Sequence, residues 1–207
     1  MITLYHCANA RSFRALWMLE EAGLDYELKL LPFPPRVRQP EYLEENPLGT
    51  IPLLIDGETR MTESSAICEY IAAKYAPELG VRPDESGFGA YLNALHFGEA
   101  TLTFPQTLVL RYTMLEPEER RLPQAAEDYR KWFLGRLKGL GRILENSDYV
   151  AADRFTAADV SVAYAILLAG SLRIEEALND PKIAAYWERM KARDGFKRAK
   201  QAQKMDG

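Results

Sequence analysis

Cysteine and histidine are scarce in this chain, which has two residues of each among its 207. Cys7 and Cys68 lie far apart and form neither a CxxC nor a CxxH pattern. The sequence therefore carries no disulfide framework and no zinc-site spacing. The two histidines, His6 and His96, are too few to change this conclusion, so we expect no metal site.

Long apolar runs and blocks of like charge are also missing. No apolar stretch approaches the ~18 residues of a membrane-spanning helix, and the first residues enter a strand-like pattern without the features of a secretion signal. The 26 basic and 30 acidic residues leave a net charge of −4. We therefore expect a soluble, cytoplasmic protein without nucleic-acid or membrane partners. One mild cluster of charge is a basic C-terminal tail around Lys197, Arg198, Lys200 and Lys204.

Apolar and aromatic residues, by contrast, are plentiful enough for a sizeable core. Hydrophobic residues make up 47% of the chain, which includes 11 Tyr, 8 Phe and 3 Trp. A length of 207 residues exceeds one average domain but is short for two large ones. We expect a small domain joined to a somewhat larger one.

The first part of the chain alternates between strand and helix patterns. Ala15, Met18, Leu19 and Ala22 follow the spacing of a buried helix face, and Asp-Gly between two short expected strands is a strong hairpin signal. The order is therefore βαβ followed by ββα. The expected elements are a strand at 2–6, a helix at about 11–22, a strand at 26–30, hairpin strands at 51–55 and 59–61, and a helix at 64–75.

Residues 77–87 have the Pro, Gly and acidic content of a linker, and everything after them has helix patterns. We expect one long helix over 88–112, kinked or split by Pro105. Asp180-Pro181 opens another helix, because a proline in the first turn loses no hydrogen bond. A helix between these has an expected inward face formed by Tyr129, Trp132, Phe133, Leu137, Leu140 and Leu144.

Ile51-Pro52 stands at the head of an expected strand, where a proline cannot donate a ladder hydrogen bond. A cis peptide bond is one solution, since X-Pro is the only bond for which cis costs little. The exposed backbone of Ile51 could then pair with a peptide-like ligand. An ordinary trans proline at a sheet edge is the alternative, and the dipeptide alone does not separate the two.

Glu63-Ser64-Ser65 lies at the start of the helix after the hairpin. The N-H groups and hydroxyl of a helix N-terminus suit a carboxylate, and a neighbouring Glu suits an ammonium group. Together they could hold both ends of an α-amino acid. Simple N-capping by a hydroxyl is the competing interpretation.

The loop Cys7-Ala8-Asn9-Ala10-Arg11-Ser12 connects the first strand to the first helix. Short polar side chains and helical N-H groups converge at such a position and can stabilise a thiolate. The sulfur could belong to Cys7 or to a ligand. Alternatively, Asn9 or Ser12 only caps the helix and Cys7 is a small buried apolar residue.

The order of these features is more specific than any one of them. The segment Asn46-Pro47-Leu48-Gly49-Thr50-Ile51-Pro52 is followed by Glu63-Ser64 about a dozen residues later. Thr156-Ala157-Ala158-Asp159 then forms a capping box at the start of a late apolar helix. In this combination, and over nearly its full length, the sequence resembles the glutathione transferase superfamily.

The resemblance implies an α/β plus all-α fold. Residues 1–76 would form a thioredoxin-like βαβ-ββα domain that binds glutathione, 77–87 a linker, and 88–207 an all-helical bundle domain that supplies most of the second-substrate pocket. It also implies a homodimer, a role in detoxification, and a structural rather than catalytic Asp159.

The resemblance assigns roles to matching residues around the bound glutathione. Pro52 would be cis, and the backbone of Ile51 would pair with the cysteinyl part. Glu63 and Ser64 would hold the γ-glutamyl end. Thr50, next to the cis-proline turn, would contact the glycyl end.

The expected catalytic loop departs from the family pattern of a Tyr, Ser or Cys. Arg14 resembles an arginine common in the first helix of serine-type classes, and counting back from it places the hydroxyl position at Asn9 or Ala10. Neither has a hydroxyl. We expect Asn9 to donate an amide hydrogen bond to the glutathione thiolate. Other candidates in the loop are Ser12 as a second donor, Arg11 as a source of positive charge and Cys7 as a less favoured nucleophile.

The expected function is a transferase that activates glutathione as a thiolate for attack on an electrophilic, largely apolar small molecule. The alternatives are a glutathione-dependent lyase that cleaves ethers, a disulfide-bond reductase, and a non-catalytic binding module of the same fold. An isomerase is disfavoured by the resemblance, because the isomerase class of that superfamily has a Ser-Ser-Cys run in the loop, which is absent here. Candidate residues of the second-substrate pocket are Phe13, Leu102, Phe104, Arg111 and Tyr112.

Overall fold

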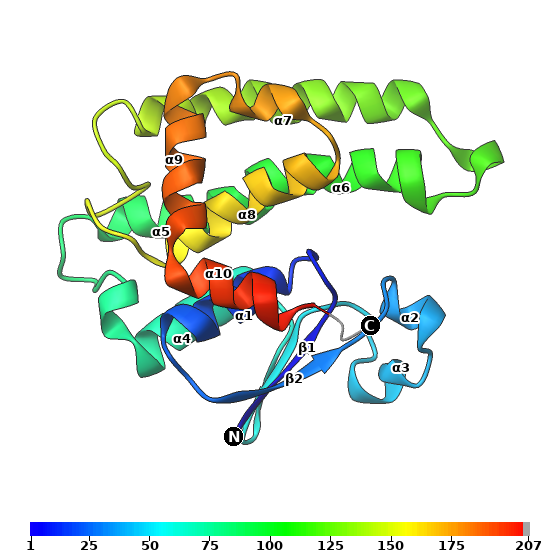
Figure 1. Cartoon of the computed structure of the whole chain (residues 1–207), viewed down its shortest axis with the longest axis horizontal. Helices are drawn as coiled ribbons and strands as arrows, with labels where there is room; N and C mark the ends of the chain where they lie inside the picture. Colours follow the sequence, from blue (N-terminus) through cyan, green and yellow to red (C-terminus); the bar gives the residue numbers. More distant parts are fainter. Residues whose placement is uncertain (205–207) are drawn as a thin grey trace. The chain divides into compact units, whose positions relative to one another are not determined.

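The computed structural model describes residues 1–204, which divide into two compact units (Figure 1). The first unit contains Met1–Gly80 and the segment that begins at Lys191, and the second contains Val81–Met190. Within the described range, no helix has both the length and the apolarity that a membrane crossing requires.

A four-stranded mixed sheet forms the centre of the first unit. Its strands are β1 (Ile2–His6), β2 (Tyr26–Leu30), β3 (Leu53–Asp56) and β4 (Thr59–Met61). They lie in the order β2-β1-β3-β4, with β1 parallel to β2 and antiparallel to β3. The pattern predicted from the sequence is therefore confirmed, including the turn between β3 and β4, where Gly57 has a φ of 60°.

Helix α1 is the buried helix of this unit. Every residue from Phe13 to Leu19 is buried, because α4 and α10 both pack against α1. This packing explains why α1 is apolar on more than one face. The helices of the unit are α1 (Phe13–Glu21), α2 (Pro35–Arg38), α3 (Tyr42–Glu45), α4 (Ser64–Tyr75), the 3-10 turn η1 (Pro77–Leu79) and α10 (Asp194–Ala202).

The C-terminal helix α10 belongs to the first unit, although sequence patterns group it with the helical domain at 88–207. The Phe196 ring meets the rings of Phe13 and Trp17 edge to face, at centroid distances of 5.5 and 5.0 Å. Arg193 donates through both Nε and Nη2 to the Glu21 carboxylate, at 2.8 Å each. Contacts across so many residues have no local sequence signal, so the packing partners of this helix could not be predicted from composition.

The second unit is helical. Helix α8 is its core helix, with nearly every residue from Ala157 to Ala169 buried. The elements of the unit are α5 (Phe88–His96), the π-helical η2 (Phe97–Thr103), α6 (Phe104–Leu110), the π-helical η3 (Arg111–Leu115), η4 (Glu118–Arg120), α7 (Pro123–Ile143), α8 (Ala157–Ser171), η5 (Glu175–Leu178) and α9 (Pro181–Ala192).

Pro105 interrupts its helix through a change of hydrogen-bond register rather than a break. The π-helical segment η2 ends two residues before it, and α6 continues the same run. Side chains donate to backbone carbonyls in this stretch: Thr103 Oγ1 to Gly98 O at 2.8 Å, and Gln106 Nε2 to Leu102 O at 3.0 Å. A proline has no backbone N-H to continue the helical ladder, and these side-chain bonds lie in the turns on either side of it.

The capping box predicted at Thr156 and Asp159 is present at the start of α8. Asp159 is fully buried and accepts hydrogen bonds from the backbone N-H groups of Thr156 and Val150 at 2.9 and 3.0 Å. Tyr186 OH donates to the same carboxylate at 3.2 Å. Burial raises the pKa of Asp159 to about 6, and its contacts agree with a structural role.

Helix α7 buries most of its predicted inward face, including Phe133, Leu137 and Leu140. Trp132 is the exception, because its side chain is 49% exposed and stacks on the ring of Tyr129 at 5.5 Å. The prediction that Trp132 faces inward is therefore wrong. The mutual stacking of the two rings covers apolar surface without burial in the core.

Candidate functional site

The loop between β1 and α1 turns tightly at Asn9, which has a φ of 56°. Asn tolerates this left-handed conformation better than most residues. Backbone hydrogen bonds from Ala10 N to Cys7 O (3.1 Å) and from Phe13 N to Ala10 O (2.8 Å) complete the turn. The loop therefore has one defined shape at the end of β1.

A buried chain of polar groups runs beneath this loop. His6 and Ser12 are fully buried, and Ser12 Oγ lies 2.7 Å from His6 Nδ1. The backbone N-H of Cys7 donates to Ser12 Oγ at 3.2 Å. Burial lowers the pKa of His6 to about 4, so its imidazole is neutral at physiological pH.

Ser12 consequently holds the loop instead of facing a ligand. Its hydroxyl is directed inward, toward His6 and the backbone of Cys7, and Ser12 as a whole is not exposed to solvent. The expected contact between this hydroxyl and a ligand sulfur is not compatible with that orientation. The expectation that Ser12 donates a hydrogen bond to the glutathione thiolate is therefore wrong, and Ser12 instead stabilises the loop.

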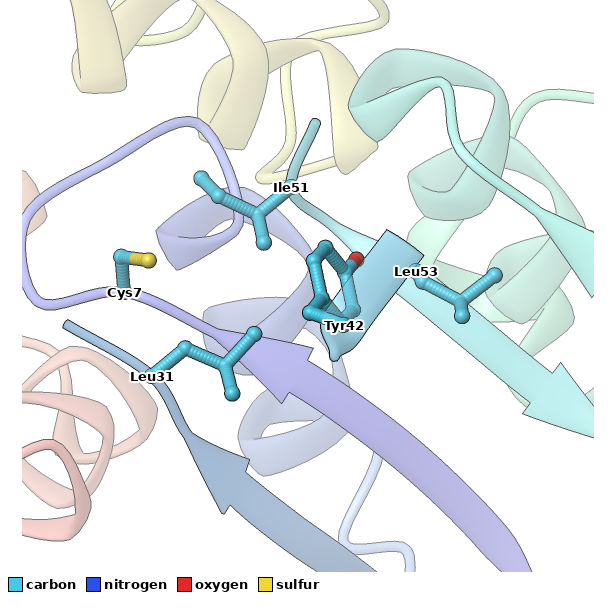
Figure 2. Packing of buried hydrophobic residues seen from close by; sticks show 5 residues of the cluster. All are labelled: Cys7, Leu31, Tyr42, Ile51 and Leu53. Carbon is cyan, nitrogen blue, oxygen red and sulfur yellow. The ribbon is translucent and has the colours of Figure 1, made fainter. Parts of the chain in front are cut away.

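Cys7 points into an apolar cluster and does not resemble an activated nucleophile (Figure 2). Its Sγ lies 3.7 Å from Pro32 O, and burial raises the pKa of its thiol to about 12. A reactive cysteine needs the opposite shift. The role of Cys7 as nucleophile is therefore not supported. The cluster comprises Cys7, Leu31, Tyr42, Ile51 and Leu53.

The segment before β3 is shaped by Asn46 and Gly49. Asn46 Nδ2 donates to Thr50 O at 2.7 Å, and Tyr42 OH donates to the same oxygen at 2.8 Å. Gly49 has a φ of 61°, and a Cβ there would lie 2.8 Å from Arg36 Cβ. These residues bring the chain to the Ile51-Pro52 peptide bond, which is cis, the isomer that the resemblance implies.

This cis bond lies beside the β1-α1 loop. The ladder between β1 and β3 ends at the pair Tyr5 and Leu53, so Ile51 lies just beyond it. Figure 2 shows Ile51 and Cys7 in the same cluster, against which Ala10 also packs. Two of the three predicted site segments are thus in contact.

The third segment, at the start of α4, is joined to α1 through Arg14. The Arg14 side chain is fully buried, and its Nη1 donates to Ser64 Oγ at 3.2 Å. Glu63 precedes the helix in an extended conformation and is exposed. A buried guanidinium adds positive charge to a helix N-terminus that already favours anions. The arrangement suits a carboxylate near Ser64 and an ammonium group near Glu63.

Two residues at the end of the chain reach the loop and were not predicted. Lys200 Nζ and Gln203 Nε2 both donate to Asn9 Oδ1 at 2.8 Å. Gln203 Oε1 accepts the Asn9 backbone N-H at 3.0 Å and lies 3.1 Å from His6 Nε2. Their spacing of three residues places them on one helix face, but no sequence feature indicates which loop they meet.

The predicted pocket residues fall into two groups. Phe13 and Leu102 have no exposure and belong to the cores of their units, so they cannot line an open pocket. Phe104 is 50% exposed, and Tyr112 is half-buried. Arg111 Nε donates to Glu116 Oε1 at 2.8 Å. Phe104, Arg111 and Tyr112 stay predictions.

Metal chemistry has no candidate site in the described part of the chain, where no three His, Cys, Asp or Glu residues group in a way that could hold an ion. The site described above is instead built from backbone groups, hydroxyls, carboxamides and cations. Such groups suit the recognition of a charged peptide-like molecule.

Comparisons with known proteins agree with this description. The family model described as glutathione S-transferase, N-terminal domain, matches residues 1–73, and the one described as glutathione S-transferase, C-terminal domain, matches residues 107–201. Glutathione S-transferase 3 of Zea mays is 31% identical over 191 residues, which cover 89% of this chain and 86% of the relative. Glutathione S-transferase 3 of Schizosaccharomyces pombe is 29% identical over 185 residues, which cover 82% and 74%.

Solved structures give the same result. A glutathione transferase of Phanerochaete chrysosporium in complex with oxidized glutathione has a TM-score of 0.85 and 26% identity, with 98% of this chain and 96% of that chain covered. A glutathione transferase of Methylococcus capsulatus has a TM-score of 0.86 and 25% identity, with 98% of each chain covered. The chain therefore belongs to the glutathione S-transferase family of enzymes.

Proposed function

We propose that the first unit binds glutathione, stabilises its thiol as a thiolate and transfers it to an electrophilic, largely apolar small molecule. The observation that carries this proposal is the junction of Arg14 with Ser64 at the start of α4, since it fixes a hydroxyl at a helix N-terminus, which favours a carboxylate. The structural relative in complex with oxidized glutathione supports the choice of ligand.

Glutathione would be held by three segments of the first unit. Ser64 and the α4 N-terminus would bind the γ-glutamyl carboxylate, and Glu63 the γ-glutamyl ammonium group. The backbone of Ile51 would pair with the cysteinyl part, as in strand addition. Thr50, whose side chain is exposed, would contact the glycyl end.

The thiolate would be stabilised by the loop at Asn9. The Asn9 carboxamide would donate an N-H to the sulfur, and Arg11 would add positive charge. The thiol proton passes to solvent, the sulfur lone pair forms the new bond to the electrophilic carbon, and the leaving group departs with its bonding electrons. Holding both reactants together contributes to the rate alongside thiolate formation. Phe104, Arg111 and Tyr112 are the proposed contacts for the electrophile.

Isothermal titration of glutathione into wild type and Ser64→Ala tests the binding site. We expect binding by wild type and about 10- to 150-fold weaker binding by the variant, because a hydrogen bond to a charged group contributes about 1.5–3 kcal/mol. Ser86→Ala is the matched control, since Ser86 is exposed in the second unit. Equal affinity of Ser64→Ala and wild type for glutathione would show that Ser64 does not contribute to the binding site. Absence of glutathione binding by wild type would contradict the proposal.

A non-catalytic glutathione-binding module is the second candidate, because the loop presents a carboxamide at Asn9 where the family pattern has a hydroxyl or thiol. Bound glutathione would then remain a thiol. Ultraviolet absorption of the bound thiolate separates the two, since only the transferase requires the band near neutral pH.

A homodimer is part of the proposal, and the family resemblance supports it. Light scattering of the full chain should give about twice the monomer mass of 23.5 kDa. A monomer mass at micromolar concentration would contradict it.

A further inference from the structure

We propose that Lys200 and Gln203 are positioning residues that fix and polarise the Asn9 carboxamide, so that the end of the chain tunes the acidity of the bound glutathione thiol. This inference rests on the proposed function of Asn9. It adds two residues that lie 191 and 194 positions away from Asn9 in sequence.

The direction of each hydrogen bond in this network follows from one backbone group. The Asn9 N-H can only donate, so the Gln203 atom that it meets at 3.0 Å must be the carbonyl oxygen Oε1. Gln203 Nε2 is then the donor toward Asn9, and the Asn9 atom 2.8 Å away must be Oδ1. With Oδ1 assigned in this way, the other polar atom of the Asn9 carboxamide is the nitrogen Nδ2, which carries the N-H groups.

The same logic sets the tautomer of His6. Gln203 Oε1 accepts only, so His6 Nε2, at 3.1 Å, carries the proton and donates. His6 Nδ1 then accepts the Ser12 hydroxyl proton at 2.7 Å, and Ser12 Oγ accepts the Cys7 N-H. Gln203 therefore holds the loop both directly, at Asn9, and from below, through His6.

Lys200 adds charge to this arrangement. Its ammonium donates to Asn9 Oδ1 at 2.8 Å and lies 5.7 Å from the centre of the Phe13 ring. Neither partner is charged, so neither neutralises the ammonium. A cation bonded to a carboxamide oxygen withdraws electron density from the nitrogen and makes its N-H groups stronger donors. The Asn9 amide becomes better suited to a thiolate than a carboxamide in water.

Helix α10 is attached to the unit by other contacts, so this arrangement can be tested without unfolding it. Phe196 packs on Phe13 and Trp17. Arg193 pairs with Glu21, and Arg198 Nε donates to Glu20 Oε2 at 2.8 Å. Removal of the Lys200 ammonium leaves all of these contacts in place.

The test is the pKa of glutathione bound to the full-length protein, followed by the ultraviolet thiolate band as pH is varied. Lys200→Met should raise that pKa by about one unit. At a fixed pH below the pKa, the fraction of glutathione present as thiolate should then be about tenfold smaller. Lys200→Arg should restore it, since it retains a cationic donor. The pH profile of kcat/KM with an activated aryl chloride should shift by the same amount. Lys197→Met is the control, because Lys197 pairs with Asp194 on the exposed side of α10.

A double-mutant cycle decides whether Lys200 acts through Asn9. In an Asn9→Ala background, Lys200→Met should change the thiol pKa by less than a third of its effect in wild type. Additive effects, or an unchanged pKa in Lys200→Met while Asn9→Ala raises it, would overturn the positioning role and leave the proposed function intact. An unchanged pKa in Asn9→Ala itself would instead remove the proposed role of Asn9, and this inference with it.

Discussion

At the residue scale, His6 shows how burial sets the charge of a group. Its imidazole is fully buried between Ser12 and Gln203, both of them neutral. Desolvation therefore outweighs the two hydrogen bonds, and the pKa falls to about 4. A neutral imidazole can donate at Nε2 and accept at Nδ1, which is the pattern that the loop requires.

The His6 pKa predicts a dependence of stability on pH. An unfolded His binds a proton below pH ~6.5, whereas folded His6 does so only near pH 4. The native state therefore binds fewer protons in this window, and its stabilisation is lost as pH falls from 6.5 toward 4. The difference in free energy of unfolding between wild type and His6→Gln should shrink by about 2 kcal/mol from pH 7 to pH 5.

Urea unfolding of both proteins at the two pH values measures this change. Asp159, whose pKa is raised to about 6, contributes with the opposite sign, but it is common to both proteins and cancels. A difference that is constant with pH, or an imidazole that titrates near pH 6.5 by NMR, would contradict the buried neutral His6.

Local rules for helix starts and for prolines in strands singled out Ser64, Ile51 and Pro52 at this scale. The structure places Ser64 at the start of α4 and has a cis bond between Ile51 and Pro52; their role at a ligand stays a prediction. The inward turn of Ser12 was missed, and the sequence left open whether Cys7 is buried, because both depend on which residues lie beneath the loop. Gln203 supplies one of those contacts from the far end of the chain.

At the scale of elements, local patterns predicted most strands and helices of the first unit. Strands 2–6, 26–30 and 59–61 and the helix at 64–75 match the structure, because alternation and capping are local properties. The form taken by the helix around Pro105 was not predictable in detail. Its π-helical segment η2 contains a side-chain hydrogen bond from Thr103 and packs against α8, and no local pattern specifies that packing.

Gly98, in η2, makes that close approach possible. A Cβ at this position would lie 2.5 Å from Ser161 Oγ and 2.6 Å from the Ser161 backbone carbon in α8. Gly98→Ala should therefore lower the free energy of unfolding by about 1–3 kcal/mol. Gly135→Ala, in the exposed middle of α7 with no atom within 4 Å of its Cβ, should instead raise it by about 1 kcal/mol. Equal thermal midpoints for the two variants would contradict the tight contact at Gly98.

At the scale of the whole molecule, the chain returns to its N-terminal unit after the helical unit is complete. As a result, residues from near both ends of the sequence are in contact, such as Phe196 with Phe13 and Trp17. The family resemblance predicted the two-part organisation. The first change of units, between Gly80 and Val81, lies within the expected linker at 77–87. The return to the first unit at Lys191 could not be read from composition, because it depends on contacts with residues near the start of the sequence.

Phe196 should therefore stabilise the first unit strongly. Its ring is 6% exposed, and Phe196→Ala should lower the free energy of unfolding by about 3–5 kcal/mol. Met114→Ala is the control, because Met114 is 61% exposed and its loss should cost less than ~0.5 kcal/mol. A cost below about 1 kcal/mol for Phe196→Ala in urea unfolding would show that α10 is not a firm part of the unit.

The ionisation of bound glutathione tests the central claim most directly. Ultraviolet difference spectra of the saturated complex at pH 7 should show the thiolate band in wild type, because the site lowers the thiol pKa below its ordinary value of about 8.5. The band should be lost in Asn9→Ala at saturating glutathione. Glutathione that binds wild type entirely as the thiol would contradict a transferase that works through thiolate activation, and would favour the binding module.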